Sequence, residues 1–193
     1  MTTDIRIRAA RREDAEAIGR GVVMALHDEI ALDFAGSADR LPLVYKVFTT
    51  LAAADNSQYS YRNTLVAETA DGAIAGILTA YDGAALHRLR YAFIREANST
   101  LGTEFVEEEM DDETSDDEIY LDSLAVFPEY RGQNLAKRLI NAMAERHSAS
   151  GKPLGLLCEP GYDHLLKLYG ILGFRETGMR KFAGKEMHHL QRL

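Results

Sequence analysis

The stretch Ile119–Ala136, IYLDSLAVFPEYRGQNLA, has the residue types and spacing needed to hold a pyrophosphate. An apolar run leads through a proline turn and an Arg-Gly pair, Arg131-Gly132, into a helix that we expect to begin near Gln133. Backbone N–H groups at the start of a helix point outward, and the helix dipole favours negative charge there. The guanidinium of Arg131 adds a planar, charged donor for a phosphate. Small residues such as Gly132 and Ala136 let a ligand approach the backbone closely.

The same residues resemble the acyl-CoA signature of the GNAT superfamily of N-acetyltransferases. In that signature a strand ending Val-x-Pro is followed by Arg/Gln-x-x-Gly-x-Gly/Ala, and here VFP at 126–128 leads to RGQNLA at 131–136. One position departs, because Asn134 stands where the family usually has Gly. Asn tolerates left-handed backbone angles better than most residues, so we expect the loop shape to be kept. The resemblance implies that acetyl-CoA is the cosubstrate and that the loop residues contact it, namely Arg131, Gly132, Gln133, Asn134, Leu135 and Ala136.

The resemblance also implies an α/β fold of the GNAT type, a mixed central sheet flanked by helices and splayed between its fourth and fifth strands. The fourth strand would be Ile119–Val126, which is apolar apart from Asp122 and Ser123. In such a splay, unpaired backbone groups bind the pantetheine arm of the cofactor as a neighbouring strand would. Here those groups would belong to Leu124, Ala125 and Val126.

A second block, LLKLYGILGF at 165–174, has the Tyr-x-x-x-Gly-Phe spacing that is another mark of the family. The resemblance places the hydroxyl of Tyr169 near the thioester sulfur. There it would act as a general acid that protonates the departing CoA thiolate. The alternative is that Tyr169 is only an amphipathic residue on the packed face of its helix. Tyr162 stands where family members often carry an Asn that contacts the cofactor, so that contact is not carried over.

Transfer of an acetyl group to an amine needs a base, because an alkylamine with a pKa of about 10 is protonated at neutral pH. Asp122 lies in the middle of a buried strand, where a carboxylate is unfavourable unless it is paired or functional. Strand alternation predicts that its side chain shares a face with Tyr120, Leu124 and Val126. We interpret Asp122 as the base or the amine anchor, with a structural, hydrogen-bonded Asp as the alternative. Glu118 and Glu159 are lesser candidates, as is a water chain leading to a base.

The net charge of −8 comes from one segment. Residues 104–118, EFVEEEMDDETSDDE, contain ten acidic residues and no Lys or Arg, and the rest of the chain carries a charge of +2. A solvated, mobile loop is one interpretation of this run. The other is a field that draws a cationic amine towards the acceptor site. Arg88, Arg90 and Arg95 precede the run on a helix and are expected to form a solvated face that pairs with it.

Composition excludes several other classes of function. No cluster of Lys and Arg offers a nucleic-acid surface, and no 18-residue apolar run predicts a transmembrane helix. The N-terminus lacks the apolar stretch of a signal peptide. Cys158, the single cysteine, is expected to be a buried structural thiol, and the six histidines show no metal-ligand spacing. We therefore expect a soluble cytoplasmic protein with no metal, nucleic-acid or membrane partner.

Apolar periodicity predicts one domain over residues 1–193, with strands and helices in the order of the GNAT fold. A helix and the acidic loop, residues 84–118, are expected to be an insertion that bears on substrate choice. The predicted strands are 5–8, 63–68, 73–81, 119–126, 154–158, 174–182 and 186–190. The predicted helices are 12–28, 43–51, 86–102, 133–147 and 163–172.

Together these features predict an N-acetyltransferase that transfers the acetyl group of acetyl-CoA directly to a primary amine in a ternary complex. A cationic small molecule fits the acidic loop best, and a protein N-terminus or lysine is the alternative acceptor. A non-catalytic CoA-binding sensor is the alternative from another class. The resemblance is also compatible with a homodimer formed through the terminal strands.

Overall fold

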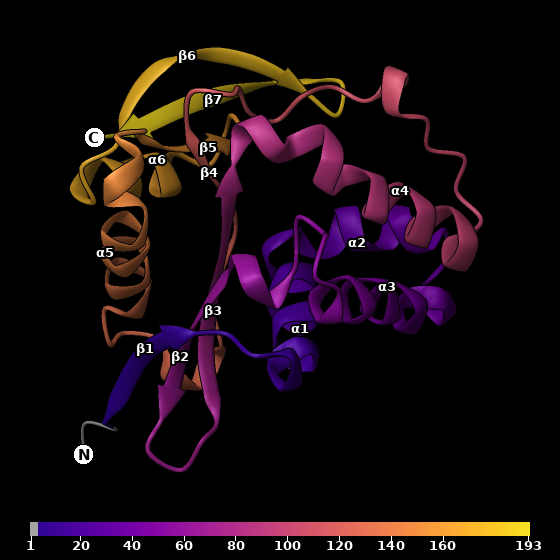
Figure 1. The fold of residues 1–193 in the computed structure, drawn as a ribbon. Helices are drawn as coiled ribbons and strands as arrows, with labels where there is room; N and C mark the ends of the chain where they lie inside the picture. The colour runs from indigo at the N-terminus through magenta and orange to yellow at the C-terminus, as the bar shows by residue number, and fades with distance from the viewer. Residues whose placement is uncertain (1–3) are drawn as a thin grey trace.

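The centre of the molecule is one seven-stranded sheet with the strand order β1-β2-β3-β4-β5-β7-β6 (Figure 1). The computed structural model describes residues 4–193, apart from the side chains of residues 27–29. The pairing of β4 with β5 is parallel and the other neighbouring pairs are antiparallel, which is the mixed sheet that the sequence predicted. The strands are β1 (Ile5–Ala9), β2 (Thr64–Thr69), β3 (Ile74–Asp82), β4 (Ile119–Val126), β5 (Leu154–Cys158), β6 (Arg175–Phe182) and β7 (Lys185–Arg192).

Helices cover both faces of this sheet (Figure 1). On one face lie α1 (Ala15–Ala25), α2 (His27–Ala35), α3 (Leu41–Ala53) and α4 (Leu86–Leu101). On the other lie α5 (Leu135–His147) and α6 (Asp163–Ile171). The predicted helix over residues 12–28 covers α1 and only the first two residues of α2, so the sequence did not predict most of α2. None of the helices in the described part of the chain is both long and apolar enough to cross a membrane.

Each face of the sheet has its own apolar core. One core joins α1, α3 and α4 to the sheet, and Phe93 of α4 stacks on Phe48 of α3 with ring centroids 6.2 Å apart. Helix α4 is thus a packed part of the domain. The other core joins α5 to the strands through Leu135, Leu139 and Ile140.

The sheet opens between β4 and β5. These strands pair at two register positions, Ile119 with Leu154 and Tyr120 with Gly155, and then diverge. Beyond that point β5 keeps its pairing with β7 as far as Cys158, so the backbone of β4 from Leu121 onward has no β5 partner. The predicted splay is confirmed.

A β-bulge interrupts β4 at Asp122. On the neighbouring strand, Thr79 pairs with Ser123 and Ala80 pairs with Leu121, which leaves Asp122 without an opposite residue. A bulge of this kind shifts the alternation of side chains by one. Tyr120 therefore packs with Tyr81, Leu86 and Leu89, whereas the side chains after the bulge, Leu124 and Val126, pack towards α5. The prediction that Tyr120, Leu124 and Val126 all share one face of the strand was wrong, because the extra residue stands between Tyr120 and the other two.

Candidate active site

A cavity of about 790 Å³ fills the gap between β4 and β5. Because its lining comes from α1 and α2 on one face and from α5 and α6 on the other, the cavity passes through the sheet. It brings together residues that the sequence singled out at widely separated positions. Those residues are Asp122, Leu124, Ala125, Val126, Arg131, Gly132, Asn134, Leu135, Ala136 and Tyr169.

The start of α5 forms one end of this cavity. Asn134 is the residue before the helix and has left-handed backbone angles, φ 57° and ψ 23°, which explains why the related signature has Gly there. The helix begins at Leu135, two residues later than predicted. Its first backbone N–H groups have no intrahelical acceptor. They are therefore available to an anion.

Side chains around this end add charge. Arg131 is exposed, and its Nε donates a hydrogen bond of 3.2 Å to the carbonyl oxygen of Val126. Lys137, in the first turn of α5, also lines the cavity. Sequence reasoning misses Lys137, although a basic residue in the first turn after the loop is a usable signal. Gln133, which we predicted to contact the cofactor, is not among the residues that line the cavity.

Tyr169 lies on α6 and lines the cavity together with Cys158. Its ring packs edge-on against Phe174, with centroids 5.7 Å apart. Burial, with a smaller contribution from nearby Cys158, raises the pKa of Tyr169 to about 12. The side chain therefore keeps its proton at neutral pH and can donate it. Cys158 is buried, and burial raises the pKa of its thiol, so it is not activated as a nucleophile.

Asp122 lies at the bulge and faces the cavity. The hydroxyl of Ser123 donates a hydrogen bond of 2.7 Å to its Oδ1. Burial raises the pKa of Asp122 to about 7; the Ser123 hydrogen bond acts in the opposite direction, and the charge of Glu113 adds a smaller upward contribution. A carboxylate with a pKa near 7 can both accept and release a proton at neutral pH, which suits a general base.

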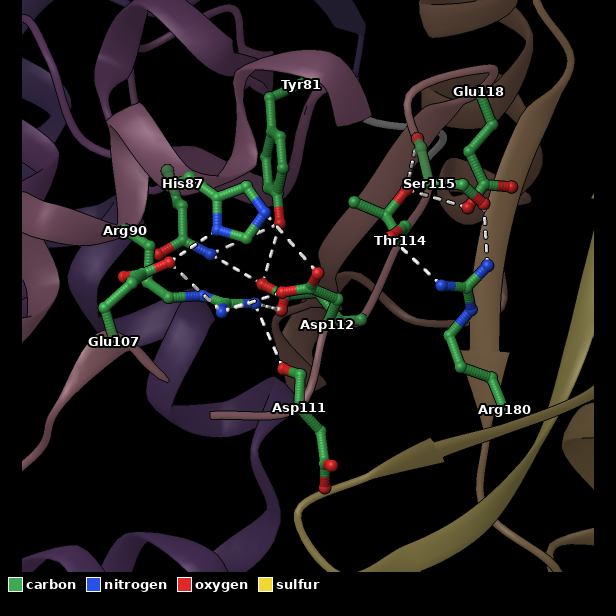
Figure 2. A network of polar contacts seen from close by, with 12 residues as sticks. Tyr81, His87, Arg90, Glu107, Asp111, Asp112, Thr114, Ser115, Glu118 and Arg180 are labelled. Atoms are coloured by element: carbon green, nitrogen blue, oxygen red, sulfur yellow. Dashed lines mark hydrogen bonds and ion pairs between the residues drawn. The ribbon is translucent and has the colours of Figure 1, made fainter. Parts of the chain in front are cut away.

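The acidic segment is folded onto the domain (Figure 2). Glu113 is buried and is ion-paired with Arg90, whose side chain is only 1% exposed. The amide of Gln58 and the hydroxyl of Tyr81 donate hydrogen bonds of 2.7 and 2.9 Å to the same carboxylate oxygen of Glu113. The expectation of a solvated loop beside a solvated arginine face is wrong for this pair. Exposed carboxylates remain at Glu104, Glu108, Glu109, Asp112, Asp116 and Asp117.

The far end of the segment is tied to the C-terminal hairpin. Arg180 of β6 donates to the carbonyl of Thr114 at 3.0 Å and to the hydroxyl of Ser115 at 2.6 Å (Figure 2). Because Phe182 at the end of β6 and Met187 near the start of β7 line the cavity, the segment connects α4 to the cavity wall.

The two lesser candidates for the base are both engaged elsewhere. Glu118 is fully buried and accepts hydrogen bonds from Thr114 at 2.7 Å and Gln191 at 2.9 Å, with His189 Nε2 at 2.8 Å. It does not line the cavity. Glu159 does line the cavity, but its Oε1 lies 2.5 Å from Nζ of Lys185. This leaves Asp122 as the better-placed candidate.

Comparisons with known proteins agree with this architecture. A family model described as Acetyltransferase (GNAT) family matches residues 46–174. A solved N-acetyltransferase from Staphylococcus aureus Mu50 is 24% identical, with a TM-score of 0.75, over 96% of this chain and 99% of that chain. A second solved structure, named as an acetyltransferase, is 29% identical, with a TM-score of 0.74, over 97% of this chain and 98% of that chain. A comparison with curated proteins gave no match.

Proposed function

The chain belongs to the acetyltransferase (GNAT) family, and from that membership we propose that it transfers the acetyl group of acetyl-CoA to the nitrogen of a primary amine. We propose a small molecule that is cationic at neutral pH as the acceptor. The observation that carries the proposal is the cavity through the splayed sheet, with the first turn of α5 at one end and Asp122 and Tyr169 along its walls.

The residues present fit acetyl-CoA. The left-handed Asn134 places the first N–H groups of α5 at the cavity, and Arg131 and Lys137 add positive charge beside them. Beyond Tyr120 the backbone of β4 has no β5 partner, so Leu124, Ala125 and Val126 can hold an extended amide chain as a strand would. When bound there, acetyl-CoA supplies an acetyl group activated as a thioester.

The side chains around it would move two protons. Asp122 accepts a proton from the ammonium of the acceptor, which leaves a neutral nitrogen that can form the new N–C bond. Its pKa of about 7 leaves a substantial fraction ionised at neutral pH. The hydroxyl of Tyr169 donates a proton to sulfur as the C–S bond breaks, and its high pKa keeps that proton available. The second proton, which the acylated nitrogen loses as it becomes the amide, returns to the Tyr169 oxygen. Both ligands are then present together, as direct transfer requires.

Calorimetric titration of the protein with acetyl-CoA, followed by thiol release in the presence of amines, tests this proposal. We expect saturable binding and amine-dependent release of CoA. Replacing Arg131 with Ala should weaken acetyl-CoA binding by roughly tenfold or more, because charge-assisted hydrogen bonds to phosphate are lost. Exposed Arg88 on α4 gives a matched control in Arg88→Ala, which should bind normally. Binding without thiol release from any amine would instead favour a CoA-sensing module.

A further inference from the structure

The part of the cavity on the α1–α2 side has apolar walls. Met24 and Leu26 come from the junction of α1 and α2, Ile30 from α2, Leu157 from β5 and Phe182 from β6. All five side chains are only partly buried, so each presents apolar surface to the cavity. Removing such surface from water is favourable, and cavities lined in this way bind apolar groups.

Asp122 provides a negative charge in this region. Among the described side chains that line the cavity, the carboxylates are Asp122 and Glu159, and Glu159 is ion-paired with Lys185. No residue of the acidic segment, 104–118, lines the cavity. Its buried carboxylates, Glu113 and Glu118, already have partners. Among the described side chains, one ammonium therefore has a place beside Asp122, whereas a second one further along would lie against Met24, Leu26, Ile30, Leu157 and Phe182.

The acidic segment thus does not form the acceptor pocket. Its exposed carboxylates, such as Glu108 and Asp117, can attract any cation from solution. Selection among cations must come from the walls that the acceptor touches, and burying a charge against those walls without a partner is unfavourable.

We propose that the acceptor is an amine with one ammonium group and an apolar body, the ammonium beside Asp122 and the body against Met24, Leu26, Ile30, Leu157 and Phe182. This rests on the proposed function and narrows its acceptor from cationic small molecules in general to apolar monoamines. Polyamines would be poor acceptors.

A matched pair of acceptors tests the proposal directly. n-Hexylamine and 1,6-diaminohexane have the same carbon chain and differ by one terminal amine. We expect kcat/KM from thiol release to be about tenfold or more higher for n-hexylamine, because the second ammonium of the diamine would be buried against apolar walls. In the series from n-propylamine to n-hexylamine, kcat/KM should rise by about threefold to fourfold per methylene, as expected for burial of a CH₂ group.

A carboxylate placed in the wall should change this preference. Ile30→Glu is expected to lower kcat/KM for n-hexylamine and raise it for the diamine. Leu32→Glu is the matched control, because Leu32 is 40% exposed on the same helix and does not line the cavity. It should keep the wild-type ratio. Titration of both variants with acetyl-CoA checks that they are folded.

Equal or better turnover of 1,6-diaminohexane by the wild-type protein would overturn the inference and leave the proposed function intact. Turnover of spermidine or of a peptide N-terminus without turnover of n-hexylamine would do the same. Thiol release from no amine at all would overturn both.

Discussion

The hydroxyl of Tyr169 is the proton donor on which the proposed transfer depends at the scale of single residues. Tyr169→Phe keeps the ring and its contact with Phe174 but removes the proton. We expect turnover to fall by about 100-fold, a typical contribution of a general acid, while the affinity for acetyl-CoA stays unchanged. Parallel thiol-release assays and calorimetry measure the two quantities. Equal turnover in the variant would remove Tyr169 from the mechanism.

Asp122 should set the pH dependence of the reaction. A base with a pKa of about 7 is protonated below that pH, so kcat should fall about tenfold per pH unit on the acidic side and level off above pH 7. Asp122→Asn should be slow and should lack this limb of the pH profile. If the pH profile of Asp122→Asn keeps the same fall in kcat on the acidic side, that fall belongs to another group.

The same carboxylate should reduce stability at high pH. Its pKa is raised in the folded protein from an ordinary value of about 3.9 in the unfolded chain. The folded state therefore binds the extra proton between pH 4 and pH 7, and the free energy of unfolding falls as pH rises through this window. We expect Asp122→Asn to raise the melting temperature at pH 8 and to have little effect at pH 4. Calorimetric melts at both pH values measure the difference, and the same gain at both would contradict the argument.

At the scale of elements, the turn into α5 depends on the left-handed conformation of Asn134. Asn134→Gly should bind acetyl-CoA as the wild type does, because Gly adopts these angles freely. Asn134→Val should weaken binding and lower the melting temperature, since a β-branched residue in this region is strained by about 1–2 kcal/mol. Calorimetry of the two variants side by side tests this. Tight binding by the Val variant would show that the loop shape does not require the left-handed residue.

The sequence predicts most of the helices and strands well. It does not predict which side chains point to the same face of the sheet. β4 was correctly placed at Ile119–Val126 because this stretch is apolar apart from Asp122 and Ser123. The bulge at Asp122 could not be foreseen, since it depends on how Thr79 and Ala80 of β3 align with β4. Similarly, the composition of an acidic segment does not tell whether its carboxylates are solvated or ion-paired. The burial of Arg90 and Glu113 follows from the docking of α4, which local periodicity does not reveal.

At the scale of the whole molecule, the acidic segment joins α4 to the C-terminal hairpin through buried polar contacts. Arg90→Ala would leave Glu113 buried without its cation, and breaking such a pair by removing one partner is destabilising by about 3–5 kcal/mol. We expect this loss in the free energy of unfolding, measured by urea titration. Arg88→Ala, on the exposed side of the same helix, should change it by less than about 0.5 kcal/mol. A similar small change for Arg90→Ala would mean that the pair does not support the fold.

Because the cavity passes through the sheet, the two ligands could enter it from opposite faces. In the proposed function, the cofactor would enter from the α5 side at the start of that helix, and the acceptor would enter from the α1–α2 side beside Asp122. Neither ligand needs to leave before the other can enter, so we expect random-order kinetics, with either substrate able to bind to the free protein. Product-inhibition patterns and equilibrium binding of each substrate alone would show this. The acetylated amine could then depart while CoA is still bound, and the enzyme would not have to empty completely between turnovers.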